Sequence, residues 1–156
     1  MISKIKFLVL ILATALLVSC GGKEKSDVKP ASSVKEYHLT ANDQMKFNLN
    51  AMVAEAGQKV KIVFENIGKM PKETMGHNFV LLKPDVDVAA FAAEAVNSKD
   101  NEYIPANSND IIFHSKLLGP GEKVILEFNA PQKGTYKFIC SFPGHYITMQ
   151  GNFVVK

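Results

Sequence analysis

The 156-residue sequence contains no arginine and no tryptophan, only two cysteines and only four histidines. Arginine is the side chain that reads phosphates and base edges through paired hydrogen bonds, so its absence disfavours a nucleic-acid partner. The formal net charge of +3 does not replace these paired hydrogen bonds, because all 18 basic residues are lysines. Long apolar runs are also missing. The run from Phe7 to Val18 has 12 residues, against the roughly 20 that a membrane-spanning helix needs.

The N-terminal segment has the features of an export signal. Lys4 and Lys6 precede the apolar run. The run ends in Leu17-Val18-Ser19-Cys20, which resembles the bacterial lipobox, where cleavage precedes a cysteine that is then acylated. We therefore expect residues 1–19 to be a signal peptide and Cys20 to carry lipid. An anchor helix, or a secretory signal with an incidental cysteine, would be the alternatives.

Lipidation of Cys20 would leave Cys140 without a disulfide partner. Residues 20–34 are rich in glycine, serine and lysine, which predicts a flexible linker before a folded domain at 35–156. The protein is then exported and anchored to a bacterial membrane, with the outer membrane favoured and the domain in the periplasm or at the cell surface. Because that compartment is oxidising, an unpaired cysteine needs a reason to stay reduced, and metal coordination supplies one.

From about residue 34 the hydrophobic pattern has a period of two. Alternating or continuous apolar segments, separated by turn sequences with glycine or proline, occupy residues 45–50, 60–65, 79–82, 124–128, 136–140 and 153–155. The pattern predicts an all-β fold, an antiparallel sandwich or barrel of about eight strands. The alanine-rich segment 84–96 carries acidic residues in its first turn, which predicts one short helix inserted between strands.

The sequence CSFPGHYITM at 140–149 places Cys140, His145 and Met149 within ten positions. Taken singly, each residue type is more often a packing or surface residue. Together, a reversal at Pro143-Gly144 would let one loop present a thiolate, an imidazole and a thioether to a common point. This soft donor set favours copper over magnesium or calcium, and a copper site of this kind requires a second histidine.

His77 is the favoured second histidine, because Gly76 allows close backbone approach and a buried strand follows at once. His38 lies in a polar strand next to the linker. His114 has charged and polar neighbours. We expect both of these histidines at the surface.

Met75-Gly76-His77-Asn78, followed by Cys140 to Met149, resembles the azurins of the cupredoxin family. Similar segments extend along the whole domain, at residues 42–45, 71–72, 114–117, 121–123 and 134–136. The resemblance implies a Greek-key β-sandwich with one type 1 copper ion. It implies the ligands His77, Cys140 and His145, with Met149 as axial ligand and the Gly76 carbonyl as a weak, distant second axial oxygen.

The resemblance also implies roles for residues around the ligands. Asn78 would hydrogen-bond across to the cysteine loop, with Ser141 beside it, and a backbone N–H near Phe142 would tune the sulfur. The sequence departs from the family in three ways. It has too few cysteines for the internal disulfide, Phe79 replaces a tryptophan, and Asn66 stands where azurins often have a buried histidine, which argues against a pH-linked switch.

The implied function is one-electron transfer with redox proteins such as c-type cytochromes or terminal reductases and oxidases, without enzymatic activity. The electron would pass by the edge of His145, inside an apolar partner patch formed by Met45, Met70, Met75, Phe142, Pro143 and Ile147. A copper-binding or storage lipoprotein without a redox role is the alternative. A copper enzyme would need a second domain or a further open metal site, for which the two remaining histidines are too scattered.

Overall fold

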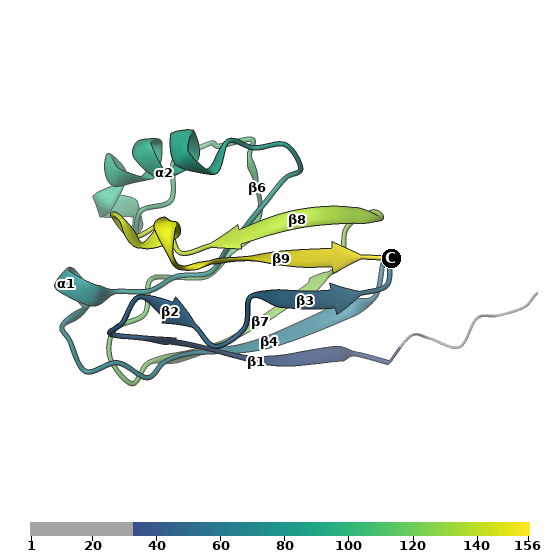
Figure 1. Cartoon of the computed structure of the whole chain (residues 1–156), viewed down its shortest axis with the longest axis horizontal. Helices are drawn as coiled ribbons and strands as arrows, with labels where there is room; N and C mark the ends of the chain where they lie inside the picture. The colour runs from purple at the N-terminus through teal and green to yellow at the C-terminus, as the bar shows by residue number, and fades with distance from the viewer. Residues whose placement is uncertain (1–32) are drawn as a thin grey trace, which may run out of the picture. The chain divides into compact units, whose positions relative to one another are not determined.

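The structure, a computed structural model, describes residues 33–156. The predicted signal peptide, Cys20 and nearly all of the predicted linker lie outside the described residues. Within the described part, nine strands form two sheets that face each other across an apolar core (Figure 1). The predicted β-sandwich is therefore confirmed, with nine strands in place of about eight. In this part of the chain, no helix is both long enough and apolar enough to cross a membrane.

The first sheet has the strand order β2 (Lys46–Phe47), β1 (Lys35–Asn42), β4 (Lys59–Asn66) and β7 (Lys123–Asn129). Side chains alternate between the core and solvent along these strands, as a period of two requires. In β4, Val60, Ile62 and Phe64 are fully buried. The outward side chains of β4 are charged except Val63, and Lys59 pairs with Glu127 of β7 at 3.0 Å.

The second sheet has the order β3 (Ala51–Ala54), β9 (Gln150–Val155), β8 (Gly134–Ile139), β5 (Val80–Leu82) and β6 (Ile111–His114). Phenylalanines fill the space between the sheets. The rings of Phe79 and Phe138 stack with centroids 5.6 Å apart, and both side chains are fully buried. Phe79 thus serves as a core residue.

The expectation of purely antiparallel pairing is wrong at two places. β1 pairs with β4 in parallel, and β3 pairs with β9 in parallel. The chain leaves the first sheet after β1 and β2 and enters the second at β3, so the parallel partners of β1 and β3 are not their sequence neighbours. Only strands joined by a short hairpin must be antiparallel.

The inserted helix is present as α2 (Val88–Val96). It begins at Val88, four residues after the start of the predicted segment. Asp85 has a left-handed φ of 63°, and the Asp87 carboxylate accepts hydrogen bonds from the first-turn N–H groups of Ala89 and Ala90, at 2.9 and 3.1 Å. The structure adds α1 (Lys72–Met75) and two 3₁₀ turns, η1 (Lys99–Asn101) and η2 (His145–Ile147), which the sequence does not predict.

The predicted strand at 45–50 is mostly wrong, since only Lys46–Phe47 is extended and paired. Met45 has a left-handed φ of 54°. The turn that replaces the strand is held by the Asn42 side chain, whose oxygen accepts the Gln44 N–H at 3.0 Å. Local side-chain to backbone bonds of this type compete with strand pairing.

Candidate metal centre

Two connections bring the predicted ligands together at one end of the sandwich. His77 lies between β4 and β5, after α1, and Cys140, His145 and Met149 lie in the connection from β8 to β9. In Figure 1, α1 and this last connection, drawn in yellow, lie at the same end. The position of His77 is fixed by a two-way backbone pairing with Leu118, at 3.1 and 2.7 Å.

The three strongest donors surround one buried point. The Cys140 Sγ atom lies 3.9 Å from Nδ1 of His77 and 3.6 Å from Nδ1 of His145. The ligand atoms of these residues all lie within 4.8 Å of one another, and all three residues are buried. Among residues 33–156 this is the one such group of histidine, cysteine or acidic side chains.

These distances fit a shared metal ion. Metal–nitrogen bonds of about 2.0 Å and metal–sulfur bonds of about 2.3 Å, at angles of roughly 120°, place nitrogen and sulfur about 3.7 Å apart. The separations of 3.6 and 3.9 Å lie on either side of that value. A trigonal plane of two histidines and one cysteine is the donor set of a type 1 copper site.

Burial keeps all three groups neutral in the metal-free protein. Burial lowers the pKa of His77 to about 4, and burial together with the nearby His77 lowers the pKa of His145 to about 4. Both imidazoles therefore keep a lone pair for a metal at neutral pH. Burial also raises the pKa of the Cys140 thiol to about 12, although the backbone N–H groups of Asn78 and Phe142 lower it in part. A bound cation is what would turn this thiol into a thiolate.

His77 differs from an ordinary buried histidine in having a ring nitrogen without a hydrogen-bond partner among the described residues. Its Nε2 atom is buried and makes no hydrogen bond of normal geometry within the described part of the chain. A buried polar atom without a partner costs roughly 1–3 kcal/mol. The atom that faces Cys140 is Nδ1, so this cost applies to the metal-free and the metal-bound protein alike.

Met149 and Gly76, the two further predicted ligands, are close in sequence to the three donors. Met149 is fully buried, and its backbone N–H donates to the His145 carbonyl at 2.8 Å, which ties the two residues into one turn. A Cβ atom on Gly76 would lie 2.6 Å from the Lys72 carbonyl oxygen and 2.9 Å from Leu117. The approach of α1 to the neighbouring loop therefore requires glycine at this position.

Asn78 joins the two ligand connections, as the family resemblance implies. Its Oδ1 atom accepts the Ser141 N–H at 2.8 Å, and its Nδ2 group donates to the Ser141 hydroxyl at 2.8 Å. Both residues are fully or almost fully buried. Because each is next to a predicted ligand, these bonds fix His77 relative to Cys140.

The other histidines lie away from this centre. His38 is exposed and lies 3.4 Å from Glu65. His114 is also exposed, and its Nδ1 contacts the Ser115 carbonyl at 3.1 Å. The surface positions predicted for both are confirmed.

The predicted partner patch divides into exposed and buried members. Met45 and Met70 are each 37% exposed and Ile147 is 66% exposed. Met75 and Pro143 are half-buried. Phe142 is only 7% exposed, because its ring packs on His145 with centroids 4.6 Å apart. Phe142 therefore lies beneath the patch and offers little surface to a partner.

Sequence reasoning missed several residues that hold these loops. The Asp43 carboxylate accepts the N–H groups of Lys69 and Met70, at 2.8 and 3.3 Å. The Thr148 hydroxyl donates to the Met45 carbonyl at 2.8 Å. The turn-forming Asn42-Asp43 pair was a signal for the first contact, whereas nothing in the sequence indicates the second.

A β-sandwich that holds a thiol and two imidazoles around one buried point defines a class of mononuclear metalloprotein. Comparison with known sequences specifies the class. The sequence model of the copper-binding proteins of the plastocyanin/azurin family matches residues 34–156. The chain belongs to this family of blue copper cupredoxins, and its cofactor is copper.

Individual relatives support the assignment to this family. Azurin of Pseudomonas aeruginosa is 34% identical over 123 residues, which cover 76% of this chain and 82% of that protein. Outer membrane protein H.8 of Neisseria meningitidis is 35% identical over 117 residues, which cover 72% of this chain. The match spans 63% of the length of H.8.

Solved structures give the same fold. Reduced auracyanin of Roseiflexus castenholzii superposes with a TM-score of 0.70 at 32% identity, over 81% of this chain and 98% of auracyanin. An azurin of Methylomonas sp. strain J superposes with a TM-score of 0.71 at 31% identity, over 78% of this chain and 98% of that azurin.

Proposed function

We propose that this protein is a one-electron carrier that uses a single type 1 copper ion and has no enzymatic activity. His77, Cys140 and His145 form the ligand plane, Met149 is the weak axial ligand, and the Gly76 carbonyl is a distant second axial oxygen. The observation that carries this proposal is the buried set of one sulfur and two imidazole nitrogens within 4.8 Å of one another.

The chain's contribution is to hold these donors in one arrangement. Copper supplies the one-electron chemistry when it is bound. The ligands stand on connections that are tied to the sandwich by backbone pairing at His77 and by the Asn78–Ser141 bonds. A rigid donor set keeps nearly the same geometry in both oxidation states, which keeps the reorganisation energy of electron transfer small. Burial excludes water, since His77 and Cys140 have no exposed surface.

His145 is the proposed route for the electron. It is 3% exposed, whereas the other two strong donors are fully covered, so its edge lies closest to solvent. The Phe142 ring packs on the His145 ring and holds its orientation.

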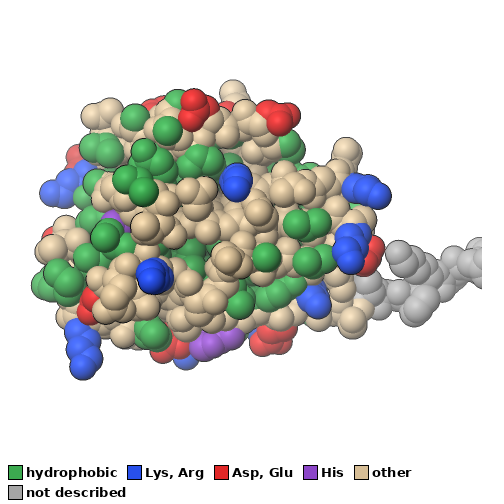
Figure 2. Space-filling view, in the orientation of Figure 1, with side chains coloured by type: hydrophobic (Ala, Val, Ile, Leu, Met, Phe, Trp, Pro, Cys, Tyr) green, Lys and Arg blue, Asp and Glu red, His purple; other side chains and the backbone are tan. Residues whose placement is uncertain are grey.

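The surface around His145 is proposed to dock the redox partner. Met45, Met70 and Ile147 come from three loops that Asp43 and Thr148 join by hydrogen bonds. Hydrophobic side chains gather on this end of the molecule in the view of Figure 2, over α1 and the β8–β9 connection. Small apolar contact areas of this kind suit brief electron-transfer encounters, here with c-type cytochromes or with terminal reductases or oxidases.

We further propose that the protein is exported and lipid-anchored at Cys20, with residues 1–19 removed and residues 20–34 as the tether of the domain at 35–156. The lipobox-like sequence supports the anchor. The similarity to a protein named for the outer membrane supports that membrane as the location. Metabolic labelling with a fatty acid tests the anchor, since a Cys20→Ala variant should lose the label.

A redox titration separates the carrier from a storage protein. The copper-loaded protein should take up one electron per copper ion and release it reversibly, without loss of the metal. Copper that is released on each reduction, or that accepts no electron, would support the storage alternative and contradict our proposal.

The docking surface has a matched control. Ile147 is 66% exposed beside His145, and Ile125 is 59% exposed on the outward face of β7. Ile147→Lys should slow electron exchange with a c-type cytochrome at least about tenfold, the effect of roughly 1.4 kcal/mol in the encounter complex. Ile125→Lys should leave the rate unchanged. Equal rates for both variants would place the docking surface elsewhere.

A further inference from the structure

Two consecutive residues after η1 have an unusual backbone. Glu102 and Tyr103 have left-handed φ angles of 55° and 62°. Residues other than glycine, asparagine and aspartate seldom adopt this conformation, and two in succession are rarer. Such a segment persists only where its surroundings hold it in place, and strained backbone of this kind collects at functional sites.

The strained backbone aims two successive carbonyl groups at the two ligand connections. The Glu102 carbonyl accepts a hydrogen bond from Asn78 Nδ2 at 3.1 Å. The Tyr103 carbonyl accepts one from the Ser141 hydroxyl at 2.8 Å. Asn78 follows His77 and Ser141 follows Cys140, so the segment contacts the immediate neighbour of two proposed ligands.

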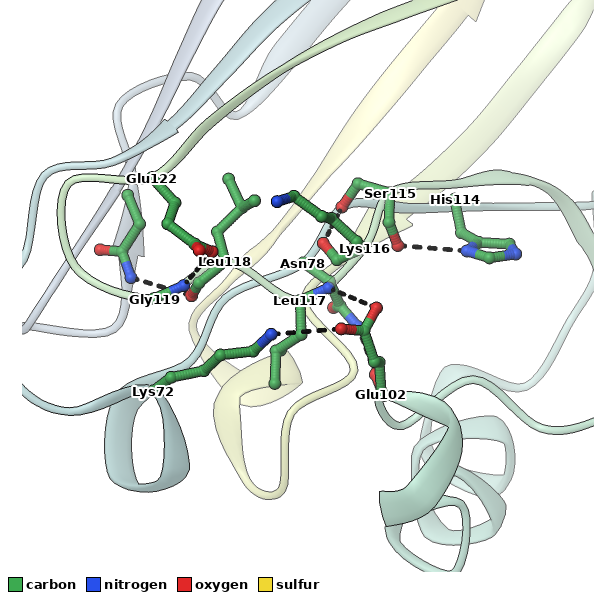
Figure 3. Close-up of polar contacts among 11 residues, drawn as sticks. Lys72, Asn78, Glu102, His114, Ser115, Lys116, Leu117, Leu118, Gly119 and Glu122 are labelled. Carbon is green, nitrogen blue, oxygen red and sulfur yellow. Dashed lines mark hydrogen bonds and ion pairs between the residues drawn. The ribbon is translucent and has the colours of Figure 1, made fainter.

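The Glu102 side chain reaches a third loop. One carboxylate oxygen accepts the Leu117 N–H at 3.0 Å, and the other lies 3.2 Å from the Lys72 ammonium (Figure 3). Leu117 precedes Leu118, whose backbone pairs in both directions with His77. Because the ion pair with Lys72 is substantially exposed, it contributes little by itself. The bond to the Leu117 N–H is the contact that supports the His77 pairing.

The Tyr103 ring supports His145 indirectly, through Phe142. It packs edge-on against Phe142 with centroids 5.0 Å apart, and Phe142 packs on His145 at 4.6 Å. The tyrosine side chain is 8% exposed, so the ring forms a buried support behind Phe142. The two residues together thus contact the surroundings of His77, Cys140 and His145.

We propose that Glu102 and Tyr103 form a clamp that positions the three strong copper ligands. The clamp acts through Asn78, Ser141, Leu117 and Phe142 and does not touch the metal. The inference rests on the proposed copper site and extends it to a segment 25 or more residues away from His77 in the sequence. Groups that orient metal ligands in this way typically change metal affinity by about 10–100-fold when they are removed.

Glu102→Gly is the main test, because glycine adopts the left-handed conformation without strain and preserves folding. Removal of the carboxylate should weaken Cu(I) binding about tenfold, measured by competition with a chelator. It should also shift the visible absorption band and the reduction potential. In the metal-free protein, the Leu117 and Leu118 amides should exchange with solvent about tenfold faster. Glu102→Gln keeps an acceptor for the Leu117 N–H and should restore most of these properties.

Two controls separate the clamp from simpler effects. Lys72→Met removes the ion pair but leaves the Leu117 bond, and should match the wild type. Tyr103→Phe keeps the ring and should also match it, whereas Tyr103→Leu should shift the absorption band. A Glu102→Gly protein with wild-type potential and amide exchange would overturn the proposal, and so would a Lys72→Met protein that behaves like Glu102→Gly. A wild-type protein that binds copper without colour would refute the proposed function, while the amide exchange would still test the clamp.

Discussion

Replacement of Asn78 by leucine tests how the fold supports the metal centre. Asn78 is fully buried and makes three hydrogen bonds, two to Ser141 and one to the Glu102 carbonyl, at 2.8, 2.8 and 3.1 Å. Leucine has the same side-chain branching but no polar atom, so the Ser141 N–H and the Glu102 carbonyl would lose their partner. At about 1–3 kcal/mol for the buried Ser141 N–H, and less for the part-buried Glu102 carbonyl, the loss is roughly 1–4 kcal/mol. That is a large share of the 5–15 kcal/mol that stabilises a typical domain.

The assay is urea unfolding of the metal-free protein, with the absorption spectrum of the copper-loaded form measured in parallel. Asn48 supplies the matched control, because it also makes two hydrogen bonds to backbone groups, with Thr40 and His38, but is exposed. Water can replace those bonds, so Asn48→Leu should cost less than about 1 kcal/mol. If Asn78→Leu costs no more than Asn48→Leu and leaves the spectrum unchanged, the proposed bridge between the ligand connections is refuted.

Two further predictions concern the ligands. Because burial holds the pKa of His77 and His145 at about 4, below the ordinary value of 6.5, the unfolded chain binds more protons between these values. The melting temperature of the metal-free protein should therefore fall as the pH drops from about 6.5 to 4, and a melting temperature that is constant over this range would contradict this prediction. Bound copper should make the dependence steeper, because it keeps protons off both imidazoles and off the Cys140 sulfur in the folded state. Met149→Leu should keep copper bound but raise the reduction potential in voltammetry, because a weak donor to the oxidised ion is lost; a large loss of copper would show that the methionine is not a weak ligand.

The sequence could indicate that His77, Cys140 and His145 come together, because the proposed ligands are close together in the chain or have distinctive neighbours. Cys140, His145 and Met149 occupy one short loop, and His77 follows a glycine and precedes a buried strand. The alternation of apolar residues in Lys59–Asn66 likewise predicts the buried face of β4. In each case a local pattern is enough, because it reflects the strand period or the chemistry of the donors.

Features that depend on contacts between distant segments were not predictable. The parallel pairing of β1 with β4 follows from the way the chain crosses between the sheets. Met45 appears in an alternating pattern but lies in a turn held by Asn42. Glu102 and Tyr103 act in part through carbonyl groups, which every residue has, and their left-handed backbone leaves no mark on the sequence.

The central claim is that the Cys140 thiolate binds copper beside two histidines, and visible absorption spectroscopy tests it most directly. The oxidised, copper-loaded protein should be intensely blue and should bleach reversibly when a reductant is added. The same measurement on Cys140→Ser should show no blue band, because the sulfur that gives rise to it is gone. A colourless copper complex of the wild type, or a blue band that survives in Cys140→Ser, would contradict the account.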